Sequence, residues 1–203
     1  MIRAFLAVEL SQELRTQLAV VQQEVKRRIE PAMKRDTRIS WVQPEKIHLT
    51  IKFLGDMDEQ LVNPLFGAVQ QAIGSRTVVQ VPLERLGVFP RPQSPRVLWV
   101  GPSEHWLQGI EAKGVAEIHG AIEAACEGVS FLRETRPFSL HLTLARIRMG
   151  ERHVGFVLTQ IGVLDRPISS GSLAVGSVVL MKSELRPTGS VYTRIWEARL
   201  KTG

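Results

Sequence analysis

The chain of 203 residues is long enough for one large domain or two small lobes around a buried core. Its composition, 44% hydrophobic and 23% charged, is that of an ordinary globular protein and excludes a disordered or low-complexity chain. The net charge of +6 favours an anionic partner such as nucleic acid, with solvated surface charge as the alternative.

The first part of the chain combines strand patterns with amphipathic helices. An apolar strand over 2–8 leads to Ser11, a typical helix N-cap, and apolar residues then recur at helical spacing until Pro31 ends the helix. A basic loop over 34–38 follows. Further strands are predicted over 47–54, 78–86 and 96–100, and further helices over 58–73 and 103–126.

The rest of the chain repeats this theme. A strand over 138–147 precedes a helix over 151–160, and strands over 172–184 and 191–200 are separated by a turn at 186–189. The two halves therefore predict an α+β duplication: two pseudo-symmetric lobes of antiparallel sheet flanked by helices, with a cleft between them. No flexible linker separates the lobes, so residues 1–203 are expected to form one rigid domain.

The single cysteine and the N-terminal segment indicate the compartment. Cys126 alone excludes an intrachain disulfide framework, suits a reducing environment and is expected to be a buried structural thiol. The apolar stretch over 1–10 is too short for a secretion signal, and no segment has the roughly 18 apolar residues that cross a bilayer. We therefore expect a soluble, cytoplasmic protein without membrane association.

Two near-identical tetrapeptides lie in the predicted strands: His48-Leu49-Thr50-Ile51 and His141-Leu142-Thr143-Leu144. Because successive strand side chains point to opposite faces, His and Thr share one face of each strand. A lone strand histidine is more often structural, but two matched pairs arise by chance in well under about 1% of such chains. Brought face to face, the pairs would place an acid and a base on either side of a small substrate.

The chain resembles the two-histidine (2H) phosphoesterases, and most closely the LigT-like RNA 2′,3′-cyclic phosphodiesterases. The residues that carry the resemblance are 5–9, 48–55, 95–101, 136–146 and 183–192, which together span nearly the whole chain. Leu140 departs from the proline that relatives often have before the second motif histidine, but both motifs are whole. One motif, 48–51 or 141–144, is expected on each lobe of a single 2H phosphoesterase domain.

The resemblance implies hydrolysis of a 2′,3′-cyclic phosphate at an RNA end to a 2′-phosphate. It makes His48 the proton donor to the 3′-oxygen and His141 the base that activates water, while Thr50 and Thr143 bind non-bridging phosphate oxygens. The residues fit this chemistry independently, since in-line displacement at phosphorus needs an acid and a base, and the ordinary pKa of histidine, about 6.5, allows either role. Which histidine is which stays open from the residues alone.

Four more residues are candidates for substrate binding. Strand alternation places Lys52 on the same face as His48 and Thr50. It places Arg146 on the face opposite His141 and Thr143, so the role of Arg146 in substrate binding is implied by the resemblance alone. Arg136 lies just ahead of the second motif and could contact the RNA backbone. Tyr192 either stacks on a base or belongs to the core.

Neither a metal nor a cofactor is expected. The sequence has no HExxH motif, no carboxylate spaced for a three-ligand site with either motif, and no glycine-rich nucleotide-binding loop. The remaining histidines, His105, His119 and His153, are expected to be isolated, and either exposed or capping residues. Four aromatic residues are expected in the core or the cleft wall: Trp41, Phe53, Phe89 and Trp99.

Three alternatives stay open. The first is the reverse reaction, 2′-5′ RNA ligation, which water at about 55 M disfavours unless a 5′-hydroxyl is held in place. The second is a small cyclic phosphate substrate, and the third is a non-catalytic RNA-binding protein on the same scaffold, against which the intact motifs argue. The expected partners are RNA with a 2′,3′-cyclic phosphate end, such as tRNA fragments, or small cyclic nucleotides, and the expected state is a monomer.

Overall fold

The computed structural model describes residues 1–168, 170–187 and 189–201. The helices are α1 (Gln12–Ile29), α2 (Val62–Ile73), α3 (Glu104–Leu107), α4 (Ile110–Gly128) and α5 (Glu151–Gln160), with 3-10 turns at 30–32, 44–46 and 59–61. The strands are β1 (Ile2–Glu9), β2 (Arg38–Trp41), β3 (His48–Met57), β4 (Val79–Pro82), β5 (Arg85–Phe89), β6 (Val97–Gly101), β7 (Leu142–Met149), β8 (Ser172–Val175), β9 (Ser177–Arg186) and β10 (Gly189–Arg199).

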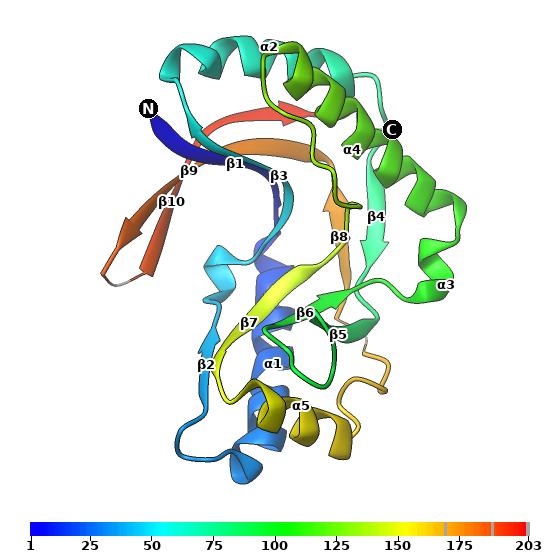
Figure 1. Cartoon of the computed structure of the whole chain (residues 1–203). Helices are drawn as coiled ribbons and strands as arrows, with labels where there is room; N and C mark the ends of the chain where they lie inside the picture. Colours follow the sequence, from blue (N-terminus) through cyan, green and yellow to red (C-terminus); the bar gives the residue numbers. More distant parts are fainter. Residues whose placement is uncertain (169, 188, 202–203) are drawn as a thin grey trace.

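One long sheet organises the molecule. Its strand order is β10-β9-β1-β3-β7-β6-β5, with β2 also paired to β7, and β4 and β8 form a separate two-stranded sheet. The pairs between these named strands run antiparallel. Antiparallel sheet with flanking helices confirms the predicted α+β class (Figure 1).

The sheet divides between β3 and β7, which in the described chain pair only through Leu49 and Leu142. On one side, β10, β9, β1 and β3 pack with α2 and α4; we call this the first lobe (Figure 1). On the other side, β2, β7, β6 and β5 pack with α1 and α5 and form the second lobe. The predicted two lobes are therefore present, and each contributes one motif strand.

The two lobes are not the two consecutive halves of the chain. The N-terminal strands β1 and β3 lie beside the C-terminal strands β9 and β10 in the first lobe. The second lobe is built from segments between them. The pseudo-symmetry therefore concerns the two motif strands and their surroundings rather than two tandem repeats.

Several element boundaries differ from the sequence prediction for local reasons. The predicted helix over 103–126 is interrupted at Gly109, which becomes the N-cap of α4, and the predicted strand over 172–184 is interrupted at Gly176. The short strand β2 was missed because only four residues form it, and a pattern that short gives no clear periodic signal. The predicted turn at 186–189 includes residue 188, which lies outside the described residues.

Over the part of the chain that the structure describes, no helix is long and apolar enough to span a membrane.

Helix α1 anchors the second motif strand from behind. Its N-cap is Ser11, as predicted, with the hydroxyl accepting a hydrogen bond from the Leu14 backbone N–H at 3.2 Å. Gln22 is only 3% exposed, and its Nε2 donates to the carbonyl oxygens of Val42 (2.8 Å) and Leu144 (2.9 Å). Since a buried amide without partners is costly, these bonds fix how β7 lies on α1.

Cys126 is a structural residue of the core, as predicted. Its side chain lies on the buried face of α4, and its thiol is unpaired. Burial raises its pKa to about 12, which keeps the thiol neutral. The residue therefore has no nucleophilic role at neutral pH.

Candidate active site

A β-bulge lies in the first motif strand, and it overturns one sequence prediction. In the register with β1, Ile51 is the extra residue between Thr50 and Lys52. An extra residue reverses the alternation of faces beyond it, so Lys52 turns to the buried side. There its Nζ donates to both carboxylate oxygens of Glu123 (3.0 and 2.8 Å) and to the Leu132 carbonyl oxygen (2.7 Å). The prediction that Lys52 faces the substrate is wrong.

The second motif strand has a bulge at the equivalent position. In the register with β6, Leu144 is the extra residue between Thr143 and Ala145. Ala145 is consequently buried, and Arg146 is exposed on the side of the motif. The parity argument that turned Arg146 away from its motif is therefore wrong, and Arg146 lines the same cavity as His141.

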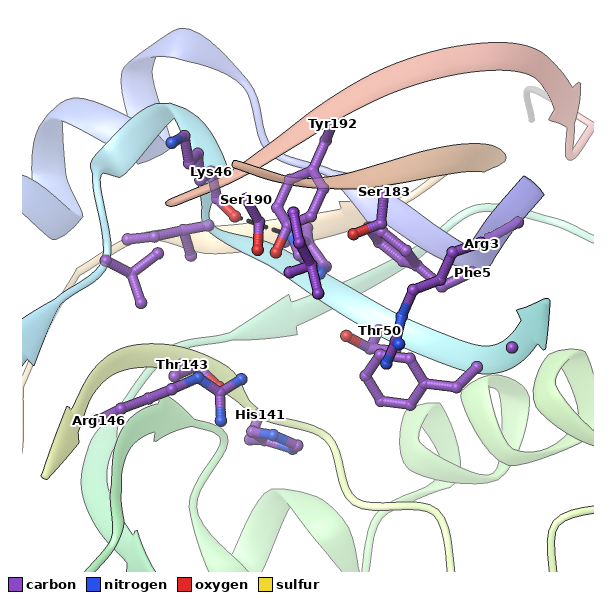
Figure 2. Close-up of a pocket in the computed structure, with 17 residues that line it drawn as sticks. Arg3, Phe5, Lys46, Thr50, His141, Thr143, Arg146, Ser183, Ser190 and Tyr192 are labelled. Atoms are coloured by element: carbon purple, nitrogen blue, oxygen red, sulfur yellow. Dashed lines mark hydrogen bonds between the residues drawn. The ribbon is translucent and has the colours of Figure 1, made fainter. Parts of the chain in front are cut away.

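A cavity of about 290 Å³ lies between the lobes, and residues of both motifs face it. Its basic side chains are Arg3, Lys46 and Arg146, and no Asp or Glu is among the described residues that line it. Figure 2 shows His141, Thr143 and Arg146 on one wall and Thr50 with Tyr192 on the other. A cavity lined by cations without opposing carboxylates is suited to an anion. The residues that line it are Arg3, Ala4, Phe5, Val42, Lys46, Ile47, His48, Thr50, Phe53, Gly55, His141, Thr143, Arg146, Ser183, Leu185, Ser190 and Tyr192.

The two histidines are held by the same kind of hydrogen bond. His48 Nδ1 lies 2.8 Å from the carbonyl oxygen of Lys46, and His141 Nδ1 lies 2.9 Å from that of Ser139. A carbonyl oxygen only accepts, so each Nδ1 carries a proton and donates it. Each Nε2 is then the ring atom that accepts or donates a proton in a reaction.

Aromatic side chains surround each imidazole. The ring of His48 packs against Phe5 (4.9 Å between centroids) and edge-to-face against Tyr192 (5.4 Å). The ring of His141 packs edge-to-face against Phe89 (5.1 Å). These contacts restrict both rings to one orientation, which a positioned acid and base require.

The surroundings lower the pKa of both histidines. Burial is the main cause at His48 and at His141, because desolvation disfavours the imidazolium. The positive charge of Arg146 lowers the pKa of both rings further. The free site therefore holds its histidines predominantly neutral near pH 7.

The structure brings together most of the residues predicted from the sequence. His48, Thr50, His141, Thr143, Arg146 and Tyr192 line the cavity. Arg136 does not line it; its side chain is 85% exposed in the loop before β7 and pairs with Glu134 at 3.3 Å.

Sequence reasoning missed several cavity residues. Arg3, Lys46, Ser183 and Ser190 line the cavity. The resemblance included the segment 183–192 but assigned no role to its serines, and strand pairing distant in sequence brings three of the four residues to the site. Phe53 was expected in the core or cleft wall, and it forms cleft wall with 70% of its surface exposed. Its place beyond the bulge of β3 corresponds to that of Arg146 in β7.

The other histidines lie outside this cavity. His105 is exposed, and His153 Nε2 bonds to the Ala32 carbonyl oxygen at 2.8 Å. His119 is not isolated, contrary to expectation: it stacks on Phe138 at 4.1 Å and lies 3.8 Å from Glu123. No group of three His, Cys, Asp or Glu side chains that could hold a metal ion occurs in the ranges described.

A two-lobed sheet that brings one His-x-Thr strand from each lobe to a cation-lined cavity defines a 2H phosphoesterase. The sequence profile described as LigT like Phosphoesterase matches residues 8–99 and 110–192, and the chain belongs to this family. The RNA 2′,3′-cyclic phosphodiesterase of Methanothermobacter thermautotrophicus is 30% identical over 199 residues, covering 98% of this chain and 99% of that protein. The protein of the same name from Aquifex aeolicus is 30% identical over 176 residues, covering 86% and 88%.

Solved structures agree with the fold. TT0787 of Thermus thermophilus superposes with a TM-score of 0.69 at 27% identity, and 98% of each chain is covered. LigT of E. coli superposes with a TM-score of 0.71 at 20% identity, again over 98% of each chain. The agreement in fold therefore includes both lobes.

Proposed function

We propose that this protein is an RNA 2′,3′-cyclic phosphodiesterase that opens the cyclic phosphate at an RNA end to a 2′-phosphate. Two relatives at 30% identity over most of the chain carry this name. The cavity has the two protonatable groups and the positive charge that the reaction needs.

The reaction is an in-line displacement by water. His141 Nε2 takes a proton from water as the new bond between water oxygen and phosphorus forms. His48 Nε2 gives its proton to the 3′-oxygen as the bond between phosphorus and that oxygen breaks. Thr50 and Thr143 donate hydrogen bonds to the non-bridging oxygens, and Arg146 offsets the negative charge that develops on them.

The single observation that carries the proposal is the matched pair of imidazoles. Each Nδ1 donates to a carbonyl two residues earlier in the chain, and each ring faces the same cavity from its own lobe. A histidine with a purely structural role has no reason to face a cation-lined cavity with its Nε2. A reaction at phosphorus needs one imidazole to donate a proton and a second to accept one, and the cavity has one from each lobe.

The test uses an RNA oligonucleotide with a 2′,3′-cyclic phosphate end, incubated with purified protein in the presence of a chelator. We expect a 2′-phosphate product, formed by the wild type and lost in His48→Ala. A 3′-phosphate product would contradict the assignment of the leaving oxygen. An intact but bound RNA would contradict the enzyme and favour an RNA-binding protein.

The proposal includes the biological setting. RNA ends with a cyclic phosphate, such as those of tRNA fragments, are the proposed substrates, together with small cyclic nucleotides. The single buried thiol of Cys126 is compatible with the reducing cytoplasm, where we propose that the protein acts as a monomer. Light scattering during size-exclusion chromatography measures the oligomeric state directly.

A further inference from the structure

Basic side chains continue beyond the cavity along the edge of the second lobe. Ser40 on β2 pairs directly with Arg146 on β7, so the two residues share one face of the sheet. Arg38, two residues before Ser40, lies on the same side of β2 and is exposed. Ile39 and Trp41, which alternate with them, pack on the core.

Arg148 lies next to Arg38. It follows Arg146 by two residues, about 7 Å along the strand, and is the extra residue of a bulge opposite Arg38 and Ile39. The loop before β2 adds the exposed side chains of Lys34 and Arg35. We call this set the basic edge: Lys34, Arg35, Arg38, Arg146 and Arg148.

Carboxylates do not neutralise the basic edge. Across the described ranges, none of its five side chains forms an ion pair, although Asp36 lies in the same loop. The guanidinium of Arg38 donates instead to the carbonyl oxygens of Arg35 (2.9 Å) and Thr37 (3.1 Å). The five charges of the basic edge are therefore not paired with a carboxylate within the described ranges.

The opposite side of the cleft differs in this respect. On the β9–β10 hairpin of the first lobe, Glu184 pairs with Lys182 and with Arg186, both at 2.9 Å. Arg194 pairs with Glu9 at 3.1 Å. Positive charge that leads out of the cavity is therefore concentrated on one side, along β2 and β7.

We propose that the RNA chain on the 5′ side of the cyclic phosphate leaves the cavity along the basic edge, with its backbone phosphates bound by Arg148 and Arg38, beyond Arg146 at the cyclic phosphate. This inference rests on the proposed RNA substrate and adds the path of the chain to it. Exposed arginines that contact phosphates position a strand without reading its bases, so the contact is independent of sequence. A mononucleotide, which has no second phosphate, does not reach Arg38 or Arg148.

The test compares two substrates: a mononucleoside 2′,3′-cyclic phosphate and a single-stranded 10-mer RNA with the same end. The double variant Arg38→Ala/Arg148→Ala removes two charges from the basic edge. The double variant Arg27→Ala/Arg199→Ala removes two exposed arginines elsewhere and is the matched control. The quantity compared is the ratio of kcat/KM for the 10-mer to kcat/KM for the mononucleotide.

For the basic-edge variant we expect this ratio to fall about tenfold or more, through KM for the 10-mer. Its KM should also depend less on salt, by about 1.4 in the slope of log KM against log salt for two lost phosphate contacts. In the control variant the ratio should stay within about twofold. An unchanged ratio in the basic-edge variant, or an equal fall in the control, would overturn the proposal.

Failure of the proposed function is distinguishable from failure of this inference. A wild type that hydrolyses neither substrate contradicts the proposed function. The role of the basic edge is then tested by measuring the affinity of each variant for a labelled 10-mer by fluorescence anisotropy. Weaker binding by the basic-edge variant alone would support the path, and equal binding by both variants would overturn it. A wild type that hydrolyses only the mononucleotide overturns the RNA substrate and the path together.

Discussion

Leu49 and Leu142, the second residues of the two motifs, pair with each other across β3 and β7. Because equivalent residues of antiparallel strands meet at this pair, an approximate twofold axis passes between them. The axis relates the two imidazole–carbonyl hydrogen bonds and the two bulges on either side of it. If this register is continued by one residue in each direction, His48 falls opposite Thr143 and His141 opposite Thr50, so each histidine is expected beside the threonine of the other strand.

Loss of either imidazole should abolish most turnover. We expect His48→Ala and His141→Ala each to lower kcat by about 10²- to 10⁴-fold, because a positioned acid or base contributes that much. Steady-state hydrolysis of a 2′,3′-cyclic phosphate measures it. His105→Ala, at an exposed histidine outside the cavity, is the control and should keep full activity. Near wild-type turnover in either motif variant would refute the two-histidine mechanism.

The threonine hydroxyls should act on the transition state. Thr50→Val and Thr143→Val keep the shape of the side chain and remove one hydrogen-bond donor, for which a loss of about 10²- to 10³-fold in kcat is expected. Thr193→Val, at an exposed position of β10, should change nothing. If KM rises while kcat stays constant, the hydroxyls only hold the ground state, and the proposed role is wrong.

The pH profile should reflect the lowered pKa values of the pair. The reaction needs one imidazole protonated and the other neutral, so kcat/KM follows a bell that belongs to the pair. Burial, and then Arg146, lower both pKa values from 6.5, so the donor loses its proton at a lower pH than free histidine does. We expect the optimum of kcat/KM below pH 6.5 and that of kcat higher, because bound phosphate favours the imidazolium. A profile that is flat from about pH 5 to 9 speaks against the mechanism.

Arg146 should influence the same profile. In Arg146→Met the positive charge near both rings is gone, so both pKa values should rise and the optimum of kcat/KM should move to higher pH. The substitution should also raise KM, since the cavity loses one of its three cations. Measurement of the full profile separates the two effects. An optimum that stays in place would mean that burial alone sets the pKa values.

The buried ion pair behind the first motif should be important for stability. In Glu123→Gln the Lys52 ammonium loses its counter-charge in a site where both side chains are about 5% exposed, and a loss of about 3–5 kcal/mol is expected on denaturant unfolding. The double change Lys52→Met/Glu123→Leu should recover most of it. Arg199→Ala, which breaks an exposed pair with Glu197, should lose less than about 1 kcal/mol. A similarly small loss in Glu123→Gln would show that the pair is dispensable.

The motif strands and the four motif residues were predictable because strand alternation and the repeated His-x-Thr pattern are local signals. Beyond each motif the prediction failed at Lys52 and Arg146, because a bulge reverses the faces and the sequence carries no periodic sign of it. Arg3 and Ser190 were missed for another reason. Their place in the site depends on pairing between β1, β9 and β10, which lie at opposite ends of the chain.

The interleaving of the lobes has a consequence for how the chain folds during synthesis. Ala4 in β1 pairs with Lys182 in β9, so the strand that is made first has to wait for a partner made almost last. Pairing over such a sequence distance slows folding and leaves an open strand edge exposed while the ribosome advances. A chain arrested before β9 would contain both motif strands and could pair β1 with β3, yet it would lack the Tyr192 ring that packs against His48. A nascent chain therefore completes the cavity around its two motifs only when translation is nearly finished.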